Sequence, residues 1–107
     1  MELNVEERSA LSRVTQTLRE RFGAREIILY GSAARGQMDA ESDIDLLVVL
    51  PSLDWETQKA ISDVCFDAGL QCDRLISTGC YTVDEIEHSP LQSSPLVRTA
   101  RREGQPL

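Results

Sequence analysis

The chain has 107 residues, of which 11 are basic and 18 are acidic, so its formal net charge at pH 7 is −7. Such an acidic chain lacks a sequence-independent attraction for the phosphate backbone, and no DNA or RNA binding is expected. The length fits one small domain, residues 1–107, with a single core and no second lobe.

We expect neither a signal peptide nor a membrane-spanning segment in this sequence. A signal peptide begins with basic residues followed by apolar ones, whereas the first residues of this chain are acidic. No stretch approaches the roughly 20 apolar residues of a membrane span. Three cysteines, an odd number without paired metal-ligand spacing, are typical of free thiols in a reducing compartment. We therefore predict a cytoplasmic protein without a membrane segment.

An amphipathic helix followed by a buried strand is predicted at the start of the chain. Apolar residues recur every three or four positions within residues 5–22, at Leu11, Val14, Leu18 and Phe22. Gly23 then stands where helices commonly end. Residues 27–30 are a short apolar run stopped by Gly31, which is typical of a buried strand.

The most apolar stretch of the chain predicts the central strand. Residues 37–41 are polar and predict a loop, and residues 44–50 form a continuous apolar run that ends at Pro51. Strand alternation places Asp43, Asp45 and Leu47 on one face. The two carboxylates are thus expected at the entry end of this strand.

A second helix is predicted over residues 55–68, with Asp54 as its N-cap and Gly69 after its end. Residues 71–77 alternate loosely in polarity and predict a third strand that contains Asp73.

The last third of the chain predicts further helical structure. Thr82 and Glu85 form a capping box for one or two turns, and Ser94-Pro95 begins a final helix that ends at Gly104. Leu96, Val97 and Ala100 are expected to face inward. The order helix, strand, strand, helix, strand, helix predicts an α/β fold, with helices packed on a small mixed sheet.

One motif carries most of the chemical information. Gly31-Ser32 and Arg35-Gly36 lie between the first two strands, and Ser42-Asp43-Ile44-Asp45 follows after five residues. A Gly-Ser turn can bring backbone N–H groups against phosphate oxygens. Two carboxylates on one strand face can hold a divalent cation. The combination indicates a metal-assisted nucleotide site.

This spacing, Gly-Ser-x-x-Arg-Gly-x5-Ser-Asp-x-Asp, resembles the nucleotidyltransferase signature of the DNA polymerase β superfamily, in particular its minimal nucleotidyltransferase (MNT) branch. The resemblance implies a polymerase β-like fold and transfer of a nucleotidyl group with ATP and Mg²⁺. It also implies that Asp43 and Asp45 are catalytic metal ligands.

The resemblance assigns roles to further residues. A third metal-binding carboxylate on the next strand matches Asp73, for which an ion pair with Arg74 or Arg35 is the structural alternative. Ser32 is expected to contact phosphate, with Gly31 permitting its close approach. In the same motif Arg35 would neutralise triphosphate charge or pair with a catalytic Asp, and Ser42 would orient the turn before Asp43.

The same resemblance suggests a biological role, with two alternatives. Small MNT proteins commonly act as antitoxins that transfer AMP to a tyrosine of a HEPN-type ribonuclease toxin, so a protein partner and a homo- or hetero-oligomer are expected. One alternative is nucleotidyl transfer to a small-molecule hydroxyl. The other is a binding module that neutralises its partner by docking, with a dispensable active site.

Overall fold

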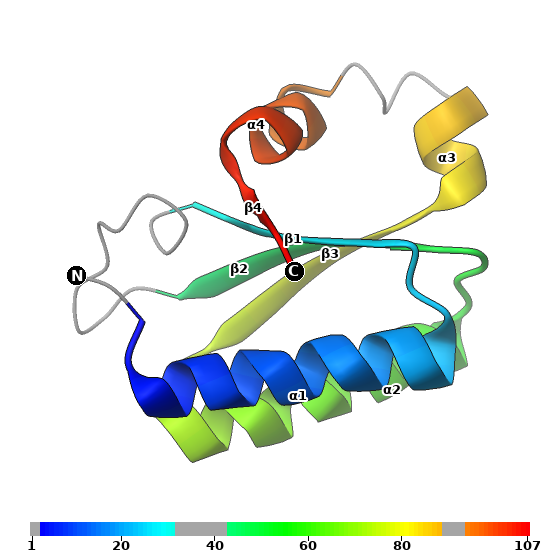
Figure 1. The fold of residues 1–107 in the computed structure, drawn as a ribbon. Helices are drawn as coiled ribbons and strands as arrows, with labels where there is room; N and C mark the ends of the chain where they lie inside the picture. Colours follow the sequence, from blue (N-terminus) through cyan, green and yellow to red (C-terminus); the bar gives the residue numbers. More distant parts are fainter. Residues whose placement is uncertain (1–2, 32–42, 89–93) are drawn as a thin grey trace.

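The computed structural model describes residues 3–31, 43–88 and 94–107, which form one mixed sheet with helices on both faces (Figure 1). The strands lie in the order β3-β2-β1-β4, in which β4 is the short strand Gln105–Pro106. Strand β2 (Ile44–Leu50) is antiparallel to β1 (Glu26–Tyr30) and parallel to β3 (Ile76–Thr82). The predicted α/β class and the first two strands are confirmed, whereas the predicted loop at 37–41 lies outside the described residues.

Two hydrophobic layers cover opposite faces of the sheet. Helices α1 (Val5–Phe22) and α2 (Trp55–Cys72) pack on one face, and α3 (Val83–His88) and α4 (Pro95–Glu103) lie over the other (Figure 1). Alternate residues of β2 enter the two layers, with Leu46, Val48 and Leu50 on the α1 and α2 side and Leu47 and Val49 on the other. This double burial explains why the strand reads as a continuous apolar run.

Helix α1 (Val5–Phe22) has the bounds predicted from its periodicity. The side chain of Asn4 accepts a hydrogen bond of 2.8 Å from the backbone N–H of Glu7, and the Glu7 carboxylate accepts one of 2.8 Å from the N–H of Asn4. This reciprocal capping box stabilises the first turn. Gly23, with φ 67°, ends the helix in the left-handed conformation.

Helix α2 (Trp55–Cys72) begins after Asp54 as predicted, but it runs past Gly69 to Cys72. Gly69 is buried within the helix, and a Cβ there would lie 2.4 Å from the carbonyl oxygen of Arg74. Its role is close packing of the following turn, so the prediction that it ends the helix is wrong. Asp73, with φ 55° and ψ 42°, caps the helix instead.

The third strand therefore starts later than predicted. It spans Ile76–Thr82 instead of residues 71–77, and Asp73 lies on the helix cap outside it. The longer helix uses the residues that had been assigned to the start of the strand. Cys65 and Cys72 are buried free thiols in the core, as expected of small apolar side chains.

The helices over the second face start at the predicted signals. For α3 (Val83–His88), Glu85 Oε1 accepts a 3.1 Å hydrogen bond from Thr82 N–H, and Thr82 Oγ1 accepts one of 3.0 Å from Glu85 N–H. Helix α4 (Pro95–Glu103) begins with the predicted proline, although Ser94 makes no side-chain capping bond. Its Val97 and Ala100 are buried, whereas Leu96 is 41% exposed and does not face inward as predicted.

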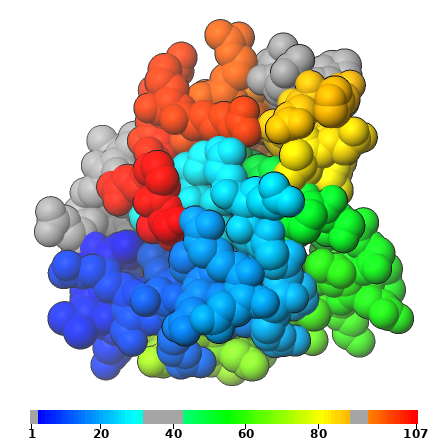
Figure 2. Space-filling view, turned by 45° about the vertical axis from the view of Figure 1, so that its right-hand side comes forward, coloured from blue at the N-terminus to red at the C-terminus, as the bar shows by residue number. Residues whose placement is uncertain are grey.

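A short strand after α4 was not predicted. Strand β4 (Gln105–Pro106) pairs with Ile28 and Leu29 of β1, and the N–H of Leu107 donates to the carbonyl of Ile27 at 2.9 Å. Arg19 of α1 donates to the carbonyl of Leu107 at 2.5 Å, so this segment (red) lies against α1 (blue) in Figure 2. Two residues, one of them proline, give no alternating pattern to detect.

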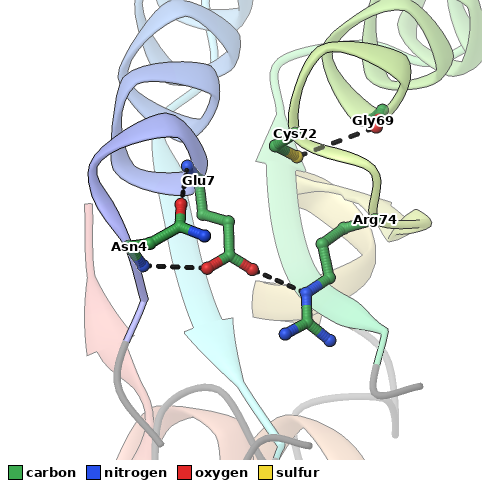
Figure 3. Close-up of polar contacts among 5 residues, drawn as sticks. All are labelled: Asn4, Glu7, Gly69, Cys72 and Arg74. Atoms are coloured by element: carbon green, nitrogen blue, oxygen red, sulfur yellow. Dashed lines mark hydrogen bonds and ion pairs between the residues drawn. The ribbon is translucent and has the colours of Figure 1, made fainter. Parts of the chain in front are cut away.

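A buried ion pair joins the start of α1 to the turn between α2 and β3. Arg74 Nε lies 2.6 Å from Glu7 Oε2, and the two side chains are 8% and 2% exposed (Figure 3). The other oxygen of Glu7 belongs to the capping box, so both carboxylate oxygens are hydrogen-bonded.

None of the helices in the described part of the chain has the length and apolar character to cross a membrane.

Removing one partner of the ion pair between Glu7 and Arg74 should lower the stability of the fold more than removing both charges does. We expect Arg74→Met to lower the free energy of unfolding by about 3 kcal/mol, because it leaves a buried carboxylate without its cation. The double variant Glu7→Gln/Arg74→Met should recover much of this loss, since glutamine keeps the capping acceptor without the charge. Urea denaturation measures both.

Arg102→Met provides a matched control for the loss of an arginine. Arg102 pairs with Glu103 at 3.6 Å on the surface, where the side chains are 67% and 50% exposed, so its loss should cost less than about 1 kcal/mol. Equal stability of Arg74→Met and the double variant would contradict the assigned role of the charge.

Candidate active site

The candidate site lies where β1 ends and β2 begins. The antiparallel register pairs Tyr30 with Asp45, so Gly31 leaves β1 beside the first residues of β2. Asp43 is exposed just before the strand, and Asp45 is half-buried as its second residue. The structure thus brings Gly31, Asp43 and Asp45 together, which is the arrangement that the sequence predicted.

Gly31 is required by the close approach of a carboxylate. Its φ is 75°, a region that L side chains rarely adopt, and a Cβ would lie 2.7 Å from Oδ2 of Asp45. The turn therefore holds its backbone directly against the Asp45 side chain. This contact fixes Gly31, the residue that follows β1, relative to the acidic start of β2.

The electrostatics of the site favour a bound cation. Burial first, and the negative charge of Asp43 second, raise the pKa of Asp45 above its usual value. Burial, and then the charge of Asp45 and the neighbouring Tyr81, raise the pKa of Tyr30. A cation placed between the two carboxylates would relieve this repulsion, and carboxylate oxygens are the ligands that Mg²⁺ prefers.

Asp73 does not complete a three-carboxylate centre. It lies exposed on the α2 cap, outside the strand that was expected to present it. Among residues 3–31, 43–88 and 94–107 there is no group of three His, Cys, Asp or Glu side chains placed to hold a metal ion. The prediction of Asp73 on the sheet beside the other two aspartates is therefore wrong, because α2 extends through that segment.

The residue that the register places beside Asp45 is Ser77. The two are paired in the parallel β2–β3 ladder, so their side chains lie on the same face of the sheet, and Ser77 is exposed. The sequence analysis missed this residue because it started the strand too early. Matching the apolar residues Ile44 and Ile76, which the structure pairs, would have found it.

Three further predicted residues lie outside the described part of the chain. These are Ser32, Arg35 and Ser42, the proposed phosphate-binding and turn-orienting side chains. Their roles remain predictions.

Comparison with known proteins agrees with the fold and the motif. The model of a nucleotidyltransferase domain matches residues 11–97 of this chain. The chain therefore belongs to the nucleotidyltransferase domain family, and its mixed sheet packed against helices is consistent with the polymerase β-like fold.

The chain also has a curated relative of known activity class. The chain is similar to the protein adenylyltransferase MntA of Thermococcus cleftensis, with 48% identity over 48 residues. The match covers 42% of this chain and 48% of the relative, so the chain spans about half the length of the curated protein it matches.

Adding one methyl group at Gly31 should disrupt the site. Gly31→Ala should lower the free energy of unfolding by about 2 kcal/mol, because alanine is strained at this φ and its Cβ displaces the Asp45 carboxylate. Urea denaturation gives the stability, and the carboxyl carbon NMR signal of Asp45 reports the displacement.

Gly79→Ala is the matched control for Gly31→Ala. The nearest atom to a Cβ at Gly79 is a ring carbon of Tyr81 at 3.7 Å, an ordinary contact distance, so this variant should have little effect. Equal effects of the two substitutions would contradict the assigned role of Gly31.

The raised pKa of Asp45 makes a prediction about stability and pH. A folded-state pKa above the unfolded value means that ionised Asp45 opposes folding, and stability falls as the pH rises through that folded pKa. Asp45→Asn should therefore raise the melting temperature at pH 7, with a smaller gain in acid. Thermal unfolding between pH 4 and pH 7 tests this; a gain that grows toward acid would refute it.

Ionisation of Asp54 should affect stability in the opposite direction to ionisation of Asp45. The backbone N–H of Thr57 donates to its carboxylate at 2.7 Å and lowers the pKa of Asp54, so ionisation of this side chain favours folding. Asp54→Asn should therefore lower the melting temperature at pH 7.

Proposed function

We propose that this chain transfers AMP from ATP to a hydroxyl group of a partner protein. The observation that carries the proposal is the contact between Gly31 and Asp45, which joins a glycine turn to an acidic strand end. A turn able to approach phosphate and a carboxylate pair able to hold a cation are the two parts that nucleotidyl transfer needs.

The residues of the site have distinct roles in this proposal. Asp43 and Asp45 would hold Mg²⁺ together with the triphosphate, and the ion would neutralise charge on the phosphate oxygens. Ser32 and Arg35 would contact the triphosphate beyond Gly31, and Ser42 would orient the approach to Asp43. These assignments rest on the motif and on the position of the turn beside the strand.

The transfer is a substitution at the α-phosphorus. The acceptor hydroxyl oxygen forms a bond to that phosphorus, the bond to the bridging oxygen of the leaving group breaks, and pyrophosphate departs. The hydroxyl proton passes to a carboxylate of the site.

A protein acceptor is favoured by the relative and by the charge of the chain. The name of the similar MntA protein describes a protein adenylyltransferase. The net charge of −7 suits a basic partner surface. Within the MNT resemblance, the acceptor is a tyrosine of a HEPN-type toxin, and the chain acts as its antitoxin in the cytoplasm.

Intact-mass spectrometry tests the reaction and the acceptor together. The purified chain is incubated with ATP, Mg²⁺ and the product of the neighbouring gene, and both proteins are weighed. We expect AMP to be added to the partner. Asp43→Asn and Asp45→Asn should each reduce the rate at least 1,000-fold, and a chelator should abolish the transfer.

Asp84→Asn is the matched control for these substitutions. Asp84 is an exposed aspartate on α3 whose side chain lies 3.0 Å from His88, away from the site, so this variant should transfer AMP at the normal rate. Unchanged transfer by Asp43→Asn and Asp45→Asn would refute the assigned site. A stable complex without added AMP would favour neutralisation by docking alone.

A further inference from the structure

Exposed apolar side chains gather at the end of α2. Phe66, Leu70 and Leu75 are 63%, 68% and 61% exposed. Phe66 and Leu70 are four residues apart and lie on one face of the helix, and Leu75 follows in the turn before β3. Large apolar side chains that cluster in this way on a surface commonly mark an interaction site.

These three side chains line a groove of about 270 Å³. The buried residues Cys65, Gly69 and Ile76 also line it. Gly69 brings the turn close to the helix, since a side chain there would collide with the carbonyl of Arg74. The groove is large enough to receive one apolar side chain of a partner.

The groove also adjoins the edge of the sheet. Ile76, which lines the groove, is the first residue of β3, and in the described residues β3 has a strand neighbour only on its β2 side. An edge strand next to an apolar groove offers backbone hydrogen bonds together with a pocket for a side chain.

Acidic residues surround these apolar side chains. Asp73, an exposed carboxylate, lines the groove, and so does Arg74, whose charge is balanced by its ion pair with Glu7. Asp63 and Asp67 are exposed on α2. The helix contains Glu56 besides these two aspartates but only one basic residue, Lys59. A second copy of the chain would bring the same acidic groups opposite each other, whereas a basic segment would complement them.

The groove and the candidate active site lie at the same end of β2 and β3 but on opposite faces of the sheet. The groove residues Cys65 and Ile76 belong to the α1 and α2 layer, whereas Asp45 shares the face of Leu47. The backbone N–H of Ile44, the residue between Asp43 and Asp45, donates to the carbonyl of Leu75 at 2.9 Å. A segment bound against Leu75 would therefore pass around the edge strand β3 to bring a hydroxyl to the two carboxylates. This contact links a binding surface to the place where an acceptor hydroxyl has to arrive.

We propose that the groove formed by Phe66, Leu70 and Leu75 docks the acceptor protein, through a segment that places an apolar side chain next to arginine or lysine. The apolar side chain enters the groove, and the cation lies against Asp73 and Asp67. The identity of the partner rests on the proposed function, but the docking itself requires neither ATP nor the carboxylates of the site.

Binding measured without ATP tests the inference. The product of the neighbouring gene is titrated into the wild-type chain, Phe66→Glu and Leu70→Glu in a calorimeter. We expect each substitution to weaken binding at least 100-fold, because it places a carboxylate in the apolar groove. In stopped-flow mixing, Asp67→Lys should slow association about tenfold and reduce its dependence on salt.

Val5→Glu is the matched control for the groove substitutions. Val5 is an exposed apolar residue, 77% exposed, at the start of α1, where an acidic residue suits the helix dipole. It should bind as wild type does. Melting temperatures of all variants establish that they are folded, which is expected since the substituted side chains are exposed.

The outcomes separate this inference from the proposed function. Wild-type affinity in Phe66→Glu and Leu70→Glu, or no binding by the wild-type chain, overturns the docking groove. Self-association of the wild-type chain that Phe66→Glu abolishes also overturns it, because a second copy would then fill the groove. AMP transfer that persists in Asp45→Asn refutes the proposed chemistry while leaving the groove intact.

Discussion

The burial of β2 on both faces is the constraint on which the rest of the structure depends. Its residues Leu46 to Leu50 are all buried, and they pair with β1 on one side and with β3 on the other. A shift of one residue would move each side chain into the opposite layer, so the register is strongly specified. The polar residues Asp43 and Asp45 are tolerated only because they lie at the start of the strand, at the edge of the core.

The start of β2 carries a cost in stability that a purely structural strand would avoid. Burial, and then the charge of Asp43, raise the pKa of Asp45, and a glycine in a left-handed conformation packs against the same side chain. Neither feature favours folding, because like charges repel and glycine loses the most backbone freedom on ordering. Local conflicts of this kind are expected where a protein positions groups for chemistry.

The elements with physical signals at both ends were predicted well from the sequence. Helix α1 has a capping box at its start and a left-handed glycine at its end, and the structure uses both. Helix α2 has only its N-cap, and Gly69 was interpreted as a stop although it is a packing residue. A glycine that ends a helix and one that packs within it look alike until the partner atom is known, here the carbonyl of Arg74.

That single misinterpretation explains the errors at the candidate site. The motif predicted Gly31, Asp43 and Asp45 correctly as neighbours, since they flank two strands whose apolar runs are unambiguous. Asp73 and Ser77 follow α2, so an error in the helix end changed the strand position of both. Contacts between distant segments decided this region, and local patterns contain little information about them.

The turn between α2 and β3 connects the core, the proposed docking groove and the candidate site. Arg74 anchors it to Glu7 in the interior, Leu75 lines the groove with its side chain, and the carbonyl of Leu75 binds Ile44. A buried ion pair and a sheet hydrogen bond order this turn before a partner binds, which lowers the entropic cost of docking. In the proposed complex, the binding energy of the groove would therefore be available to orient the acceptor hydroxyl toward Asp43 and Asp45.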